Sequence, residues 1–234
     1  MIKTGISNLD ELLGGGIKKG ANIMLIGPPM SGKKIISNYI MCYGAARNEN
    51  AVIEVNTYEP GYLILERFKE NKLNLTLSKV GIVDCLTRMI GIDTYEDESI
   101  KIASSSVDLT DIGVKISQHF ENFFTKKNIR KIQLNINSLS TLLMYSNINT
   151  VFRFLQVFTG RIKAAGGLGI YVIESGVHDM QVITALSQLF DGKIEIKSEK
   201  DKNFLRIVGL LPKPTQWLEY EINNSNVRIL GRTA

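Results

Sequence analysis

The chain has 234 residues, of which 44% are hydrophobic and 22% are charged, and its formal net charge is +5 at pH 7. This composition is typical of a globular protein and excludes disorder over most of the length. Two cysteines, Cys42 and Cys85, are too few for a disulfide framework, and no Cys/His cluster predicts a metal site. The moderate positive charge permits nucleic acid as a partner without arguing for it.

Neither a membrane span nor a signal peptide is expected from the sequence. No apolar run reaches the roughly 18 residues that a span needs. The first residues, Met1 to Thr4, lack the apolar run and the cleavage site of a signal peptide. We therefore expect a cytoplasmic protein that has no membrane partner.

Up to about residue 189, short apolar runs alternate with amphipathic stretches of helical length, which predicts repeated βα units. Strands are expected at 21–26, 51–57, 80–85, 132–136 and 169–173, and helices at 33–46, 60–71, 150–165 and 180–189. A further helix is expected to begin at a cap, Asp108 or Thr110, and to carry His119 at the surface or its boundary. The polar segment 90–106 is predicted to be a loop or an insertion.

The last part of the chain has a different pattern. Short strands are expected at 193–197, 204–210, 217–222 and 227–230, with a hairpin signal at Asn223 to Asn226. The sequence therefore predicts a single α/β domain whose mainly parallel sheet, flanked by helices, continues into a C-terminal antiparallel β-meander. We divide it into a lead-in (1–20), a βα core (21–189) and the meander (190–234).

A phosphate-binding loop is predicted between the first strand and the helix that follows it. Its residues are Gly27, Pro28, Pro29, Met30, Ser31, Gly32, Lys33 and Lys34. Successive backbone N–H groups of such a loop surround a phosphate, the helix N-terminus adds partial positive charge, and Lys33 reaches the outer phosphates. A glycine-rich turn that binds nothing remains the alternative.

Lys34 departs from this loop pattern, because Ser or Thr normally stands at its position and ligates Mg²⁺. An ammonium group cannot ligate a cation, so we expect Lys34 to point at phosphate in the place of the metal. The loop thus allows ATP or ADP to bind, while Mg²⁺ is not expected to bind in the usual way.

Residues 4–20, which precede this loop, follow the pattern T-G-h-x-x-L-D-x-L-L-G-G-G-h-x-x-G. Together with the loop, the segment strongly resembles RecA-like ATPases, in particular KaiC-like proteins and archaeal RadA paralogues. Further matching landmarks fall at 57–60, 137–140, 190–194 and 227–231, so the resemblance covers nearly the whole chain. It implies a RecA-type fold and a nucleotide cleft, often between neighbouring subunits of a ring or filament.

The resemblance also marks two losses at the catalytic site. Asn137 stands where the family has the Walker B aspartate, which gives a degenerate Walker B motif. Because Asn135 lies two residues earlier on the same strand face, no nearby carboxylate is expected to replace it. The family's acidic pair after the second strand is represented by Glu59 and Pro60, so that one remnant candidate for the catalytic base is left.

Two other family positions differ as well. Glu174 and Ser175 stand at the sensor position, and Lys213 is the only candidate for the cation that acts on a neighbouring subunit. Such a cation normally stabilises transition-state charge. The combined losses predict little catalysis.

The sequence supports more than one function. The preferred hypothesis is a RecA/KaiC-like protein with a decayed ATPase site, which acts as a regulator or scaffold through protein partners or in oligomers with RecA-like subunits. The alternatives are a weak or unusual ATPase and a RadA-paralogue recombination accessory protein that binds single-stranded DNA. Basic residues are sparse in the loops after the fourth and fifth predicted strands, so the argument for nucleic acid is weak.

Overall fold

The structure, a computed structural model, describes residues 1–47, 50–70, 76–92, 96–223 and 226–232. Its strands are β1 (Ala21–Gly27), β2 (Ala51–Asn56), β3 (Val80–Asp84), β4 (Ile100–Ile102), β5 (Ile132–Asn137), β6 (Leu168–Glu174), β7 (Gly192–Glu199), β8 (Lys202–Val208), β9 (Leu218–Asn223) and β10 (Asn226–Arg232). Its helices are α1 (Ser7–Leu12), α2 (Lys33–Arg47), α3 (Gly61–Glu70), α4 (Leu109–Glu121), α5 (Leu139–Tyr145), α6 (Ile148–Ala165) and α7 (Met180–Ser187), with a 3₁₀ turn η1 (Leu77–Lys79) and a π-helical turn η2 (Asn122–Lys126).

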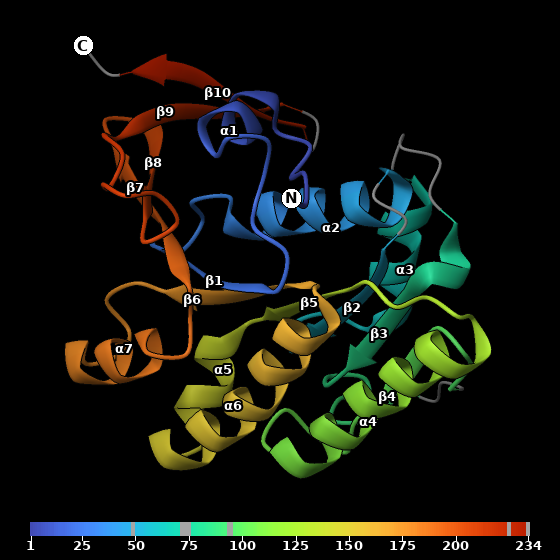
Figure 1. Ribbon diagram of the computed structural model, residues 1–234. Coiled ribbons are helices and arrows are strands. Elements are labelled where there is room, and N and C mark those ends of the chain that lie inside the picture. Colours follow the sequence, from blue (N-terminus) through green and yellow to red (C-terminus); the bar gives the residue numbers. More distant parts are fainter. Residues whose placement is uncertain (48–49, 71–75, 93–95, 224–225, 233–234) are drawn as a thin grey trace.

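In the described part of the chain, these strands form one sheet in the order β10-β9-β8-β7-β1-β6-β5-β2-β3-β4. Neighbouring strands from β7 to β4 are parallel, and β7, β8, β9 and β10 pair antiparallel in succession. Figure 1 shows α2 and α3 on one face of the parallel sheet and α4, α5 and α6 on the other. The predicted α/β class and the antiparallel meander are confirmed.

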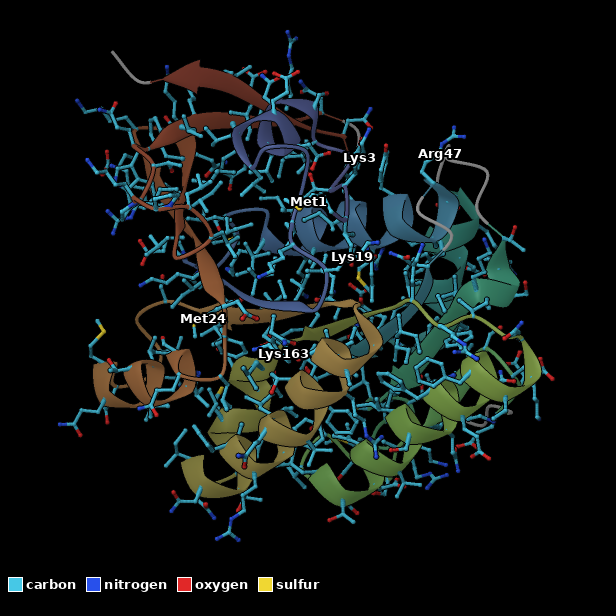
Figure 2. The ribbon with its side chains drawn as sticks, in the orientation of Figure 1. Met1, Lys3, Lys19, Met24, Arg47 and Lys163 are labelled. Carbon is cyan, nitrogen blue, oxygen red and sulfur yellow. The ribbon has the colours of Figure 1, made fainter. Side chains whose placement is uncertain are left out.

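Each face of the sheet has its own apolar core, and β1 contributes to both. Ile23 and Leu25 pack in the core beneath α2, whereas Met24, labelled in Figure 2, packs in the core that includes α6. Strands of a parallel sheet are buried on both faces, which is why β1, β2 and β5 are nearly continuous buried runs.

Local capping signals fix the ends of two long helices. Asp108 caps α4 by accepting a hydrogen bond from the Asp111 amide at 3.0 Å, which decides between the two predicted caps. Asn147 caps α6 in the same way through the Thr150 amide at 3.0 Å, and Gly166 ends it in the left-handed conformation. The sequence alone predicts the end of α6 at Gly166, whereas the structure decides which residue caps the start of each helix.

The prediction that His119 lies at the surface or its boundary is wrong. Its side chain is fully buried. Its Nε2 lies 3.1 Å from the carbonyl oxygen of Ile82, and its ring stacks on Phe123. The helix periodicity does not reveal this, because the partner is a backbone group on β3.

The short elements β4 and α5 are among those that were not predicted. β4 lies inside the segment 90–106 and pairs in parallel with β3, with Ile100 opposite Ile82. Three residues are too few for a periodic pattern, so only the neighbouring strand makes this a strand. α5 begins directly after β5, where the Ser138 hydroxyl accepts a hydrogen bond from the Thr141 amide at 3.3 Å.

The predicted lead-in folds back on itself before β1 begins. Ile2 and Ile17 form an antiparallel bridge, and Asp10 of α1 accepts hydrogen bonds from the backbone amide and the hydroxyl of Thr4. Gly16 has φ of 122°, and a Cβ there would collide with the Ile2 carbonyl, so glycine is required. Part of the glycine-rich pattern thus serves chain packing.

Some predictions fall partly outside the described residues. Asn223 pairs with Asn226 in the antiparallel β9–β10 pair, which confirms the hairpin, while Asn224 and Ser225 of its turn lie outside the described residues. The third helix is described up to Glu70, so its predicted last residue, Asn71, also lies outside them. Among the described helices, none combines the length and the apolar character needed to cross a membrane.

Candidate functional site

The predicted phosphate loop lies at the carboxyl edge of the parallel sheet. β1 ends at Gly27 and α2 begins at Lys33, so the loop connects a buried strand to a helix N-terminus. Gly32 has φ of 81° and Met30 has φ of 59°, and both are left-handed. The first turn of a helix leaves backbone N–H groups without intrahelical partners, which is the feature that phosphate oxygens use.

Lys33 is the best-connected side chain of the loop. Its side chain is 3% exposed, and its Nζ donates to the Pro28 carbonyl at 2.5 Å and contacts Glu174 Oε2 at 2.8 Å. The Ser31 hydroxyl lies 3.4 Å away. Burial lowers the pKa of Lys33, while the hydrogen bond and charge of Glu174 act in the opposite direction.

The C-terminal meander packs directly against the phosphate loop. The Tyr220 hydroxyl on β9 donates a hydrogen bond to the Ser31 carbonyl. A Cβ at Gly32 would collide with Ile222, and a Cβ at Gly27 would come within 2.7 Å of Ile196. The meander therefore stabilises the loop through these contacts, a role that the sequence pattern did not indicate.

Lys34 is half-buried beside the loop and stacks on an aromatic ring. Its Nζ lies 3.8 Å from the ring centroid of Tyr58, which follows β2 and is 39% exposed. This is a cation–π arrangement. That Lys34 faces phosphate when a nucleotide binds stays a prediction.

Asn137 is buried at the end of β5, with 1% of its surface exposed. The expectation that no carboxylate lies near it is wrong, because Glu54 on β2 is opposite Asn135 in the strand register. The Asn135 amide donates to Glu54 Oε2 at 2.7 Å, and the Asn137 amide also favours the charged form of Glu54. The sequence did contain a signal for this contact, namely a glutamate within the apolar run 51–56. An unpaired charge in a buried strand is costly, so such a glutamate is expected to have a polar partner.

Glu54 is fully buried, and its environment opposes ionisation. Desolvation raises its pKa to about 7, although hydrogen bonds from Asn135 and Asn137 and the charge of Arg67 lower it in part. Glu54 Oε1 and Asn137 Oδ1 have no hydrogen-bond partner among the described residues. The register of β2 against β5 thus brings a carboxyl group and two side-chain amides together.

Glu59, the remnant candidate for the catalytic base, already has a cationic partner. The guanidinium of Arg67 on α3 forms an ion pair with its carboxylate. The Asn56 side chain accepts hydrogen bonds from the Tyr58 and Glu59 amides, which fixes the turn that carries Glu59. The ion pair therefore holds the Glu59 carboxylate against α3.

The two sensor-position candidates lie next to the phosphate loop. Glu174 contacts Lys33, and the Ser175 amide donates to the Gly27 carbonyl at 2.8 Å. β6 and β1 are parallel neighbours, with Glu174 opposite Gly27, so the end of β6 meets the start of the loop.

Lys213 is not brought to the phosphate loop of its own chain. It is exposed in the connection that leaves β8 at Val208, opposite Lys193 near the start of β7. The phosphate loop follows the other end of β1, which runs parallel to β7. That Lys213 acts on a neighbouring subunit stays a prediction.

The loop keeps a lysine and a helix N-terminus, whereas the two positions that hold Mg²⁺ in the resembled family have other residue types. The buried ammonium of Lys33 is already beside an anionic group, the Glu174 carboxylate. The two positions that normally hold Mg²⁺ have a cation, Lys34, and an uncharged amide, Asn137. Among the described residues, no group of three or more His, Cys, Asp or Glu side chains is placed to hold a metal.

The fold is that of RecA-like and KaiC-like proteins. A KaiC-like protein (PH0186) of Pyrococcus horikoshii OT3 superposes with a TM-score of 0.69 at 16% identity, covering 97% of each chain. An uncharacterized protein (PH0321) of Pyrococcus horikoshii, crystallised in complex with an unknown peptide, superposes with a TM-score of 0.72 at 18% identity, covering 100% of each chain. At these identities the similarity concerns the fold.

Sequence comparison adds a family and one partial relative. Residues 20–196 match the model of a family of unknown function, DUF7504, and the chain belongs to that family. A stretch of 64 residues is 45% identical to the DNA repair and recombination protein RadB of Methanosphaera stadtmanae. That stretch is 27% of this chain and 26% of the relative's length, so it supports a RecA-like relationship and no more.

Proposed function

We propose that this protein binds the phosphates of ATP or ADP without hydrolysing them and acts as a regulator or scaffold for protein partners. The observation that carries the proposal is the pair of residues at the magnesium positions, Lys34 and Asn137. A lysine can hold phosphate as a point charge, but neither residue supplies the charge that a magnesium site requires. The protein would therefore keep nucleotide binding and lose magnesium-dependent hydrolysis.

The state of the nearby carboxylates supports the same proposal. Glu59 is paired with Arg67, and the fully buried Glu54 has its pKa raised to about 7 by desolvation. Glu59 is occupied by its ion pair, and Glu54 is enclosed by protein atoms, so water does not reach its carboxyl group. The loop and Lys33, in contrast, keep the features that phosphate binding needs.

Exposed apolar side chains in the segments after β5 and β6 favour a protein as the partner. Met144 and Tyr145 at the end of α5 are 65% and 62% exposed, and Met180 after β6 is 77% exposed. Segments 144–149 and 175–180 contain neither Lys nor Arg. Methionine and tyrosine are enriched in protein interfaces, whereas nucleic acid is bound mainly by cationic side chains.

Calorimetric titration of the protein with ADP and ATP, with and without Mg²⁺, tests the proposal, together with a phosphate-release assay. We expect binding that Mg²⁺ does not strengthen, and no release above that of a Lys33→Ala control. Magnesium-dependent hydrolysis that Lys33→Ala abolishes would make the chain a weak ATPase instead. The absence of nucleotide binding would contradict the proposal altogether.

The similarity to RadB favours one further candidate, a recombination accessory protein that binds single-stranded DNA. Its test is retention on single-stranded DNA at several salt concentrations, because phosphate contacts give a steep salt dependence. Retention that falls steeply with salt would favour this function over a protein scaffold.

A further inference from the structure

Glu174 is held rigidly at the end of β6, next to the phosphate loop. Its backbone amide donates to the Ser140 hydroxyl at 2.9 Å, and it stands opposite Gly27 in the strand register. Its carboxylate is 20% exposed, which is well below full hydration. The backbone therefore aims a negative charge at the loop before any ligand arrives.

Lys33 has an acceptor near it for each of its three N–H donors. The Glu174 carboxylate and the Pro28 carbonyl are within 2.8 Å, and the Ser31 hydroxyl is at 3.4 Å. An ammonium group has three donors and no acceptor. A phosphate oxygen that reaches Lys33 must therefore replace one of these partners.

Of these partners, Glu174 is the one that most strongly opposes a phosphate at Lys33. Its contact with Lys33 is a charge-assisted hydrogen bond, which is stronger than a bond to a neutral carbonyl. A carboxylate that stayed in place would also repel an arriving phosphate, because like charges a few ångströms apart disfavour each other. Through both effects, Glu174 weakens the binding of phosphate to the loop.

We propose that Glu174 is an internal competitor of phosphate, whose carboxylate occupies Lys33 in the ligand-free protein and must be displaced before a phosphate group binds. The inference rests on the proposed phosphate binding and adds its regulation. The loop then discriminates by charge: a di- or triphosphate, with several anionic oxygens, competes better than a single phosphate. A partner that draws Glu174 away from Lys33 would raise nucleotide affinity without touching the nucleotide.

The test is calorimetric titration of the full chain with pyrophosphate and with ADP. Glu174→Gln keeps the size of the side chain and removes its charge, so we expect both ligands to bind about tenfold tighter or better than to the unmodified chain. The matched control is Glu96→Gln. It removes an equally short ion pair, 2.7 Å from Glu96 to Lys115, in a segment close to β4 at the far end of the sheet.

Glu96→Gln is expected to leave both affinities unchanged within about twofold. Adding Lys33→Met to Glu174→Gln should abolish the gain. If Glu174→Gln does not fold, Glu174→Asp retains the charge but retracts it by one methylene, and a smaller gain in affinity is expected.

Two negative results have different meanings. Equal affinities for the unmodified chain and Glu174→Gln would overturn the competition while phosphate binding stands. If neither chain bound pyrophosphate or ADP, the proposed function would fail, and the inference with it.

Discussion

The Tyr220 hydroxyl on β9 donates a hydrogen bond to the Ser31 carbonyl, which connects the C-terminal meander to the phosphate loop across 189 positions of the chain. Tyr220 is 2% exposed, so water cannot easily replace this partner. The meander is thus part of the site, because it fixes the backbone of the loop that is proposed to hold phosphate.

Tyr220→Phe should therefore lower the free energy of unfolding by about 1 kcal/mol, since the Ser31 carbonyl loses its donor. It should also speed amide hydrogen exchange in the loop. Chemical denaturation and hydrogen exchange measure the two effects. Tyr145→Phe, at a position that is 62% exposed, is the matched control and should change neither. Unaltered exchange in the loop of Tyr220→Phe would show that the meander does not hold it.

Gly32→Ala and Gly160→Ala should change stability in opposite directions. At Gly32, φ is 81° and a Cβ would collide with Ile222, so alanine is strained on both counts. Gly160 lies within α6 with nothing within 4 Å of a Cβ, so alanine there should stabilise the protein by about 0.5–1 kcal/mol. Thermal unfolding distinguishes the two, and a stabilised Gly32→Ala variant would contradict the described loop geometry.

Glu54→Gln should change how stability depends on pH. The folded-state pKa of Glu54 is raised to about 7 from a reference of 4.5, so its protonated form stabilises the fold fully below pH 4.5, and this contribution is lost as the pH rises through 7. Glutamine removes the charge, so the variant should exceed the unmodified chain by up to about 3 kcal/mol at pH 8 and match it near pH 4.5.

Comparing the unmodified chain with Glu54→Gln separates the effect of Glu54 from that of His119, whose contribution to stability changes with pH in the opposite direction. Burial lowers the pKa of His119 to about 4, so its contribution is present above pH 6.5 and lost as the pH falls through 4, equally in both chains. Urea denaturation between pH 4.5 and 8 gives the difference curve. Glu221→Gln, at an exposed position on β9, should give a flat difference. A flat curve for Glu54→Gln would mean that Glu54 is ionised in the fold without cost.

Restoring one magnesium position should not restore hydrolysis. Lys34→Thr leaves Asn137, and Asn137→Asp leaves Lys34, and residues that act as a unit are not additive. The double variant should regain magnesium-dependent nucleotide binding before turnover. The structure adds that Asn137→Asp places a second carboxyl group beside the buried Glu54, so Glu54→Gln should improve its stability at neutral pH. Turnover rescued by either single reversal would contradict this account.

The sequence determined much of the scaffold because its signals are local. Continuous apolar runs predicted the central strands, Gly166 marked the end of α6, and the glycine pattern placed the phosphate loop between β1 and α2. Caps, left-handed glycines and burial patterns each depend on residues a few positions apart, so they can be found along the chain.

Only the tertiary structure decided which side chains meet at the site. The register of β2 against β5 set Glu54 beside Asn135, and the end of β6 brought Glu174 to Lys33, 141 positions away. The meander contact between Tyr220 and Ser31 is of the same kind. Strand order and register place residues side by side regardless of their separation in sequence, so the groups that control charge at the loop leave no local pattern that predicts them.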